Sequence, residues 1–279
     1  MGWLVTITAR APAKINLALH VRACRPDGYH EIETLFAFCR DGDLLKVEEA
    51  QADELTIVGP FADGLSTTDN LILSALAAMR ELGDIPPLSV TLTKNLPVAA
   101  GVGGGSADAA AMIRLLDRRY VHNGDNKELV LTTAHLGADV GACIVGRTRI
   151  GRGVGTDLHM ASADLERCPV LLINPRVPLA TGPVFAAWDG VDRGGLFEGT
   201  AREIAMAGRN DLEQPAIELC PEIADVLTAL RKTDAWLVRM SGSGATCFAL
   251  FDSEIARAEA HSAIATTHPN WWQLESTLA

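Results

Sequence analysis

The stretch LPVAAGVGGGSADAAAMIRLL at residues 96–116 most constrains the fold, because it puts four glycines into the five positions 101–105 and then becomes alanine-rich. The pattern of residues 88–93 predicts a strand, and Pro97 cannot continue it. The pattern of residues 106–119 predicts a helix capped by Ser106 or Asp108. The order is strand, loop, helix. Glycines let backbone N–H groups approach an anion, and the N-terminus of a helix favours phosphate. The loop is therefore a candidate phosphate site.

Two common nucleotide-binding patterns do not fit this loop. The P-loop requires a Gly-Lys pair, and the chain contains none. The dinucleotide pattern would begin at Gly101 and Gly103, but its third glycine falls on Ser106 and no fitting acidic strand end follows about twenty residues later. A plain glycine-rich turn, which only lets a helix pack close to a sheet, stays open from the loop alone.

Composition narrows the class of protein further. A chain of 279 residues with 48% hydrophobic content can form two domains, and a net charge of -11 disfavours binding to nucleic acid or to anionic membranes. Six cysteines without metal-ligand spacing predict reduced thiols and no structural zinc. The sequence shows neither a signal-like leader nor a run of 18 apolar residues. We expect a cytoplasmic protein with a small-molecule partner.

The hydrophobic pattern predicts a mixed α and β protein. Strands are predicted over residues 5–9, 15–21, 34–39, 44–48, 55–58 and 88–93, and helices from Asp69 or Asn70 to 80, over 106–119 and over 126–135. A glycine-rich passage at 149–169 is interpreted as the crossing between domains, and 188–208 as a surface connection. The later pattern is strand 170–173, helix 214–231, strands 235–240 and 246–251, and helix 253–265.

Three segments resemble motifs of the GHMP kinases, small-molecule kinases that lack a Walker lysine. They are APAKINLALHVRACRPDGYHEIETLF (11–36), PVAAGVGGGSADAA (97–110) and RMSGSGATCFALF (239–251), in the family's order. The resemblance implies an α+β fold of two domains, with an ATP-binding, mixed α/β domain over 1–158, a ferredoxin-like α/β domain over 159–279, and the active site between them. It also implies ATP and Mg²⁺ as cofactors, phosphorylation of an alcohol, and a monomer or weak homodimer.

Five shorter segments narrow the resemblance within the family. These are PAKINL, RPDGYHEIETLF, DNLI (69–72), LGADV (136–140) and GRNDLE (208–213), and they resemble the branch whose alcohol substrate ends in a cytidine diphosphate. The rival functions are a family kinase for homoserine, mevalonate or a sugar, a catalytically silent nucleotide-binding protein, and, least favoured by spacing, a dinucleotide-dependent oxidoreductase.

The resemblance assigns the catalytic roles to Asp139 in LGADV and Lys14 in PAKINL. A cation beside an aspartate keeps the carboxylate ionised, so Asp139 can accept or orient the hydroxyl proton while Lys14 offsets developing charge. Full proton removal and simple orientation both stay open. Without the resemblance, Asp139 is typical of a surface acid near a helix end, and Lys14 of a solvated lysine.

The resemblance also assigns the ATP site. The loop backbone holds the phosphates, Ser106 can share Mg²⁺, and three residues outside the glycine run contact adenine. The phosphate residues are Pro97, Gly101, Gly103, Gly104, Gly105 and Ser106, and the adenine residues are Asn70, Lys94 and Asp108.

The substrate residues follow in the same way. The cytidine end is assigned to Tyr29, His30 and Phe185. An aromatic pair can sandwich a pyrimidine, and an imidazole can hydrogen-bond its edge. The other end of the substrate is assigned to Asn16 and Thr181. A second glycine turn near the acceptor is assigned to Gly242, Ser243 and Gly244, with a tight bend between two strands as the alternative.

Two positions depart from the family pattern. Ala107 stands where a second serine is common, and Gly141-Ala142-Cys143 follows Asp139 where a proline and bulky apolar residues are usual. These departures affect the expected metal ligands and the local shape, but not the reaction class.

Overall fold

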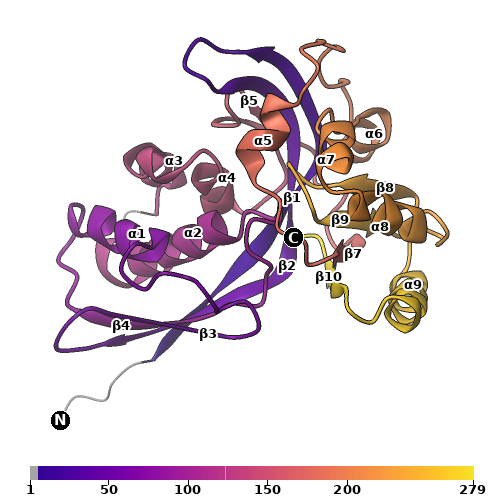
Figure 1. Ribbon diagram of the computed structural model, residues 1–279. Coiled ribbons are helices and arrows are strands. Elements are labelled where there is room, and N and C mark those ends of the chain that lie inside the picture. Colours follow the sequence, from indigo (N-terminus) through magenta and orange to yellow (C-terminus); the bar gives the residue numbers. More distant parts are fainter. Residues whose placement is uncertain (1–5, 123) are drawn as a thin grey trace. The chain divides into compact units, whose positions relative to one another are not determined.

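The computed structural model describes residues 6–122 and 124–279 (Figure 1). Val5, the first residue of the predicted strand 5–9, lies outside these ranges. The described chain forms two compact units, each assembled from separate segments. Unit 1 holds described residues within 6–13, 41–98 and 104–145, and unit 2 holds 14–40, 99–103 and 146–279. The predicted division at 158/159 concerns the family domains and stays a prediction.

Two long paired strands, β1 (Ile7–Cys24) and β2 (His30–Glu49), run through both units. The predicted strands 15–21, 34–39 and 44–48 all lie within these two, as does most of 5–9. The predicted breaks after residues 9 and 39 are therefore wrong. In β2 the polar residues around Gly42 are needed for packing rather than for a turn. A Cβ atom on Gly42 would lie 2.0 Å from the backbone oxygen of Ala11, and Asp43 is buried.

In unit 1, the end of β2 pairs antiparallel with β4 (Leu88–Thr93), and β3 (Glu54–Val58) pairs with β4 in parallel. Strand β4 has the predicted bounds. Its buried residues alternate with half-buried ones, as in a strand that presents one face to a core. The strand therefore delivers the chain directly to the glycine-rich loop.

The helices of unit 1 include α1 (Leu71–Arg80), α2 (Gly104–Leu116), α3 (Asn126–Thr132) and α4 (Val140–Val145), with a π-helical turn at Asp117–Val121 and a 3-10 turn at Ala134–Leu136. Helices α1 and α2 lie side by side, and α4 packs on α2 (Figure 1). Helix α2 begins two residues before its predicted start. Ser106 and Asp108 are therefore helical residues and not caps, while the predicted cap Asn70 of α1 is confirmed.

In unit 2, β5 (Arg149–Arg152) pairs with β2, and β6 (Asp157–Met160) pairs with β5. A second, antiparallel sheet has the order β10-β7-β9-β8, formed by β7 (Pro169–Asn174), β8 (Leu237–Met240), β9 (Cys247–Leu250) and β10 (Trp272–Thr277). Helices α8 (Glu222–Leu230) and α9 (Glu254–Thr267) pack on this sheet. The chain order β-α-β-β-α-β with this strand order is ferredoxin-like, as expected.

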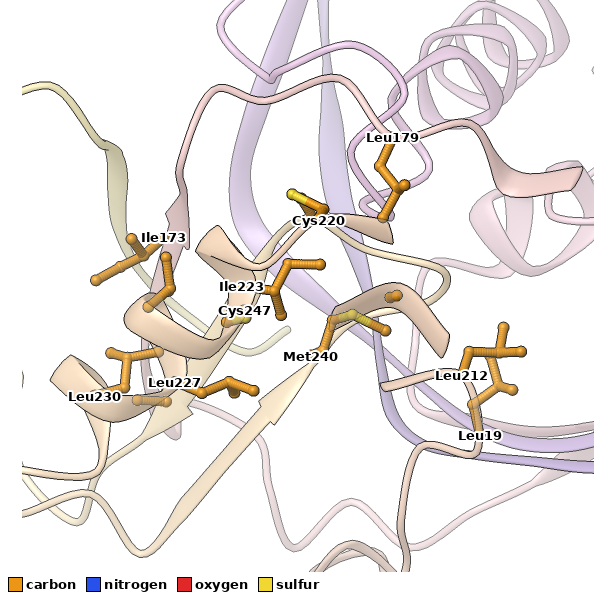
Figure 2. Close-up of a cluster of buried hydrophobic side chains, with 14 of the residues drawn as sticks. Leu19, Ile173, Leu179, Leu212, Cys220, Ile223, Leu227, Leu230, Met240 and Cys247 are labelled. Carbon is orange, nitrogen blue, oxygen red and sulfur yellow. The ribbon is translucent and has the colours of Figure 1, made fainter. Parts of the chain in front are cut away.

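The core of unit 2 lies where α8 meets this sheet. Figure 2 shows Ile223, Leu227 and Leu230 of α8 beside Met240 and Cys247 of the strands, all of them buried. The spacing of four and three residues puts the three α8 side chains on one helix face. Each fully buried side chain of this kind stabilises the fold by about 1.5–3 kcal/mol. The sheet beneath the second glycine turn is thus firmly supported.

Two predictions in unit 2 are wrong for identifiable reasons. The helix predicted over 214–231 is divided into α7 (Glu213–Leu219) and α8, because Pro221 has no N–H to continue the helix. The predicted surface connection contains α6 (Ala201–Ala207), which a capping box of Thr200 and Glu203 begins. The short helix α5 (Thr181–Ala186) was not predicted.

Among the described residues, no helix combines the length and apolar character needed to cross a membrane.

Candidate active site

The glycine-rich loop contributes to both units, because residues 99–103 pack in unit 2 and Gly104 begins α2 in unit 1. Gly101 and Gly103 have φ angles of +73° and +63°, in the left-handed region that favours glycine. A Cβ atom on Gly101 would lie 2.3 Å from the backbone oxygen of Ser241. Gly101 is therefore required by the close approach of two backbones within unit 2.

The start of α2 has the features of an anion site. Gly104, Gly105 and Ser106 form its first turn, where backbone N–H groups lack intrahelical partners. Gly105 is exposed, and a Cβ atom on it would lie 3.5 Å from the Leu71 side chain at the start of α1. The predicted adenine residue Asn70 caps α1, its Oδ1 accepting from the Ile72 N–H at 3.0 Å. The starts of α1 and α2 therefore adjoin in unit 1.

Lys94 and Asp108, the other two predicted adenine residues, form a buried ion pair in unit 1. The Lys94 Nζ lies 2.7 Å from Asp108 Oδ2 and 2.5 Å from Asp43 Oδ2. Burial on its own lowers the pKa of Lys94, but the two carboxylates outweigh it and raise that pKa. Burial raises the pKa of Asp108 to about 7, and the charge of Asp43 adds to this while Lys94 opposes it. Sequence reasoning missed Asp43.

Asp139 is half-buried and lies directly before α4 in unit 1. Its backbone oxygen accepts from the Cys143 N–H at 3.0 Å, so it belongs to the first turn of that helix. The Arg114 guanidinium of α2 donates to the Cys143 carbonyl, and burial lowers the pKa of Arg114. This contact ties the helix that follows Asp139 to the helix that follows the glycine loop. Sequence reasoning missed Arg114.

Lys14 and Asn16 are buried neighbours in unit 2. Only 4% of Lys14 is exposed, and its Nζ donates to Asn16 Oδ1 at 3.0 Å and lies 5.4 Å from the centroid of the Phe36 ring. Asn16 in turn donates from Nδ2 to Thr34 Oγ1 at 2.8 Å. The alternative of a solvated Lys14 is therefore wrong. Lys14 and Asp139 belong to different units, so their pairing stays a prediction.

The second glycine turn lies between β8 and β9 in unit 2, with φ angles of +57° at Gly242 and +89° at Gly244. The predicted residues Ser243 and Thr181 come together there, since their hydroxyl oxygens are 3.0 Å apart. A Cβ atom on Gly242 would lie 3.1 Å from the backbone oxygen of Gly101. The structure thus brings this turn against the start of the first glycine loop.

Two residues that support this turn were not predicted. Asn210 donates from Nδ2 to the backbone oxygens of Met240 and Gly242, both at 2.8 Å. The Ser241 hydroxyl donates to the Gly101 oxygen at 2.8 Å and accepts from the Asn16 N–H at 3.1 Å. The segments GRNDLE and RMSGSGA contained both residues, but only the fold shows which atoms they contact.

The predicted cytidine residues lie in unit 2. The His30 and Phe185 ring centroids are 5.0 Å apart. The ring centroid of Trp188, which sequence reasoning missed, lies 5.8 Å from that of His30, with the two rings nearly perpendicular. Burial lowers the pKa of His30, which favours the neutral imidazole at pH 7. Tyr29 is 62% exposed in the connection between β1 and β2. His30 and Phe185 are thus brought together, and the Tyr29 ring is accessible to a ligand.

Comparison with known proteins identifies the family. The GHMP kinases N terminal domain matches residues 70–147, and the GHMP kinases C terminal domain matches residues 194–270. A relative from Erythrobacter litoralis (strain HTCC2594), named 4-diphosphocytidyl-2-C-methyl-D-erythritol kinase, is 55% identical over 277 residues, covering 98% of this chain and 99% of its own. A relative of the same name from Sphingopyxis alaskensis is 53% identical over 272 residues, covering 95% and 96%.

Solved structures agree with this assignment. A crystal structure of 4-(cytidine 5'-diphospho)-2C-methyl-D-erythritol kinase has a TM-score of 0.82 and 32% identity, covering 98% of this chain and 99% of its own. A homoserine kinase from Cytophaga hutchinsonii has a TM-score of 0.75 at 19% identity, covering 100% and 96%, which shows the fold alone. The predicted two-domain α+β fold is confirmed. The chain belongs to the GHMP kinase family and, within it, to the 4-diphosphocytidyl-2-C-methyl-D-erythritol kinases.

Proposed function

We propose that this chain transfers the γ-phosphoryl group of ATP to the 2-hydroxyl of 4-diphosphocytidyl-2-C-methyl-D-erythritol. The products are ADP and the 2-phosphate, and the reaction belongs to non-mevalonate isoprenoid precursor biosynthesis. The observation that carries the proposal is the identity above one half, over nearly the whole chain, with relatives named for this kinase activity.

The ATP phosphates bind at the start of α2 in this proposal. The first backbone N–H groups of the helix, at Gly104 to Ser106, have no intrahelical partners, and the helix dipole favours negative charge there. Gly105 is exposed and carries no side chain, which lets a phosphate oxygen approach the backbone. Asn70 lies close enough in unit 1 to border the same nucleotide.

A magnesium ion fits the oxygen atoms at this site. Mg²⁺ usually binds through substrate phosphates with few protein ligands, and the half-buried Ser106 offers a hydroxyl in the first turn of α2. Among the described residues, no cluster of three or more His, Cys, Asp or Glu is arranged to hold a metal. We therefore propose that ATP supplies most of the ligands. When bound, the ion neutralises charge on the phosphates.

Asp139 and Lys14 act on the acceptor hydroxyl. The Asp139 carboxylate accepts or orients the hydroxyl proton as that oxygen bonds to the γ-phosphorus, and the bond from that phosphorus to the ADP oxygen breaks. The Lys14 ammonium, held by Asn16 at 3.0 Å, offsets the negative charge on the transferred group. Its burial strengthens this interaction, because few water molecules screen it.

The substrate's cytidine end binds at His30 and Phe185. The two rings already form one wall, and Tyr29 can close on the opposite face of the pyrimidine. A neutral His30 can both donate to and accept from the base edge. Asn16, Thr181 and the turn Gly242 to Gly244 bind the methylerythritol diphosphate end. We further propose that the enzyme works in the cytoplasm as a monomer or weak homodimer.

A coupled ADP-release assay tests the proposed function. The purified chain is given ATP with 4-diphosphocytidyl-2-C-methyl-D-erythritol, homoserine or mevalonate in parallel. We expect turnover of the cytidyl substrate alone. No turnover of that substrate, or faster turnover of another, would refute the proposal.

Two substitutions test the catalytic roles in the same assay. Asp139→Asn and Lys14→Ala should each lower kcat by about 10²-fold or more, because each removes a charged group from the transition state, while ATP still binds. Asp84→Asn, which changes an exposed carboxylate of unit 1, serves as the control. A kcat near that of the control would remove the assigned role.

A further inference from the structure

Asp43, Lys94 and Asp108 form a buried ionic cluster in unit 1, and Asp43 has no role in the proposed chemistry. Their side chains are 0%, 4% and 5% exposed, and the Lys94 Nζ lies 2.5 Å from Asp43 and 2.7 Å from Asp108. Burying charged groups is costly unless each is well paired. A cluster of three buried ionisable groups therefore calls for an explanation beyond general stability.

Asp43 fixes the chain that enters the glycine-rich loop. Its Oδ1 accepts from the backbone N–H groups of Asn95 at 2.6 Å and Leu96 at 2.8 Å. The Asn95 side chain donates in turn to the backbone oxygen of Gly42 at 3.2 Å. The segment directly before Pro97 is thus held to strand β2 by one carboxylate and one amide.

Lys94 connects this entrance to the exit of the loop. Its partner Asp108 lies on α2, 14 residues further along the chain. A Cβ atom on Gly104 would lie 3.0 Å from the Lys94 Nζ, so the ammonium sits directly against the start of the helix. One cation therefore closes the whole glycine-rich loop at its base.

We propose that Asp43 is a positioning residue for ATP binding, acting through Lys94 and Asp108 to hold the two ends of the glycine-rich loop at a fixed separation. Asp43 is fully buried, so it reaches the nucleotide only through the residues that it holds. A loop fixed before binding loses less conformational freedom when the phosphates arrive, which strengthens binding. This inference rests on the proposed use of ATP.

Asp43→Asn tests the inference with little change of shape. The amide oxygen can still accept from the Asn95 and Leu96 N–H groups, but the amide nitrogen turns a donor toward the Lys94 ammonium. We expect the Kd of a non-hydrolysable ATP analogue to rise about tenfold or more, because a charge-assisted bond at the loop base is lost. The KM for the cytidyl substrate should stay unchanged, which a general loss of structure would not produce.

Asp53→Asn is the matched control. Asp53 also accepts a backbone N–H, from Leu88 at 2.9 Å, and pairs with Arg80 at 2.5 Å, but it lies at the opposite end of β4 from the loop. Its substitution should lower the free energy of unfolding and leave the Kd of the ATP analogue unchanged. An equal rise in Kd in both variants would overturn the positioning role.

A double-variant cycle with Lys94→Met tests the route of the effect. If Asp43 acts through Lys94, adding Asp43→Asn to Lys94→Met should cause no further rise in Kd. This comparison also serves if the single variant does not fold, because the double variant removes one buried charge of each sign. A further rise, or an unchanged Kd in folded Asp43→Asn, would overturn the inference. A wild-type chain that binds no ATP analogue would instead refute the proposed function.

Discussion

The two glycine-rich segments of this chain have similar composition but are held in place by different interactions. The loop before α2 is closed at its base by charges, with the Lys94 ammonium between two carboxylates. The turn between β8 and β9 is held by neutral groups, chiefly the Asn210 amide and the Ser241 hydroxyl. Glycine content alone indicates only that the backbone comes close to a partner group. The supporting residues help to show whether that partner is the chain itself or a ligand.

The individual glycines also differ in whether the folded chain leaves room for a side chain. A Cβ atom on Gly101 would lie 2.3 Å from the Ser241 backbone oxygen, and a φ of +89° at Gly244 strains any residue with a side chain. The folded chain itself therefore disfavours a side chain at both positions. A Cβ atom on Gly105 would make only an ordinary contact at 3.5 Å. Packing within unit 1 therefore does not require glycine at 105, and this fits the phosphate site that we propose there.

The largest effect is expected for Gly101→Ala. The new Cβ atom would overlap the Ser241 oxygen, and a φ of +73° is unfavourable for alanine, so the free energy of unfolding should fall by about 3 kcal/mol. Urea unfolding measures the change. Gly190→Ala is the control, since it has a φ of +77° and open space around its Cβ position, and should cost about 1 kcal/mol. Equal costs would show that Ser241 moves aside easily.

Asn210→Ala should have the next largest effect. It leaves the Met240 and Gly242 oxygens of the neutral turn without their donor, which should cost about 2 kcal/mol. We also expect a higher KM for the cytidyl substrate in steady-state assays. Ser276→Ala removes another buried polar side chain of unit 2, on β10, and should leave that KM unchanged. A KM that rises equally in both variants would mean that the turn has no special link to the substrate.

Gly105→Ala tests a glycine that packing does not require. Alanine is favoured over glycine within a helix, so the free energy of unfolding should stay constant or rise by up to about 1 kcal/mol. The Kd of an ATP analogue, measured by calorimetry, should nevertheless increase, because the methyl group occupies the space proposed for a phosphate. A stable variant with an unchanged Kd would show that the phosphates do not approach Gly105.

Much of the fold could be predicted from local patterns, and the errors have local causes. Strand β4 and the cap Asn70 were identified because alternation and capping act over a few residues. Two further local signals were overlooked. The capping box of Thr200 and Glu203 lay in a segment interpreted as a surface connection, and the break at Pro221 lay in a segment interpreted as one helix. Strand β10 was missed because its pairing with β7 is a long-range interaction.

The site was harder to predict for the same reason. The family resemblance assigned Lys94 and Asp108 to the adenine site, which stays a prediction. Asp43, 51 residues before Lys94, is recognised only once β2 and β4 are paired. Asn210 likewise meets the second turn across 30 and 32 residues. Resemblance to a family supplies residue roles, but the interactions that hold those residues in place come from the tertiary fold.

The smallest expected effect is a difference in pH dependence between the two segments. Because the pKa of Asp108 is raised to about 7, the folded chain holds a proton there that the unfolded chain releases above the ordinary carboxyl range. That contribution is complete at low pH and is lost as the pH rises through about 7. The unfolding free energy of the wild type relative to Asp108→Asn should thus fall by about 1 kcal/mol or less between pH 6 and 7.

The neutral turn supplies the control for this measurement. The Asn210 amide does not titrate, so the difference between the wild type and Asn210→Ala should stay constant over the same interval. Urea unfolding of the three proteins at pH 6 and pH 7 makes the comparison. If both differences changed with pH alike, the dependence would come from elsewhere in the chain, and the contrast between an ionic loop base and a neutral turn would fail. If only the Asp108 difference changes, the buried charges at the base of the loop are its source.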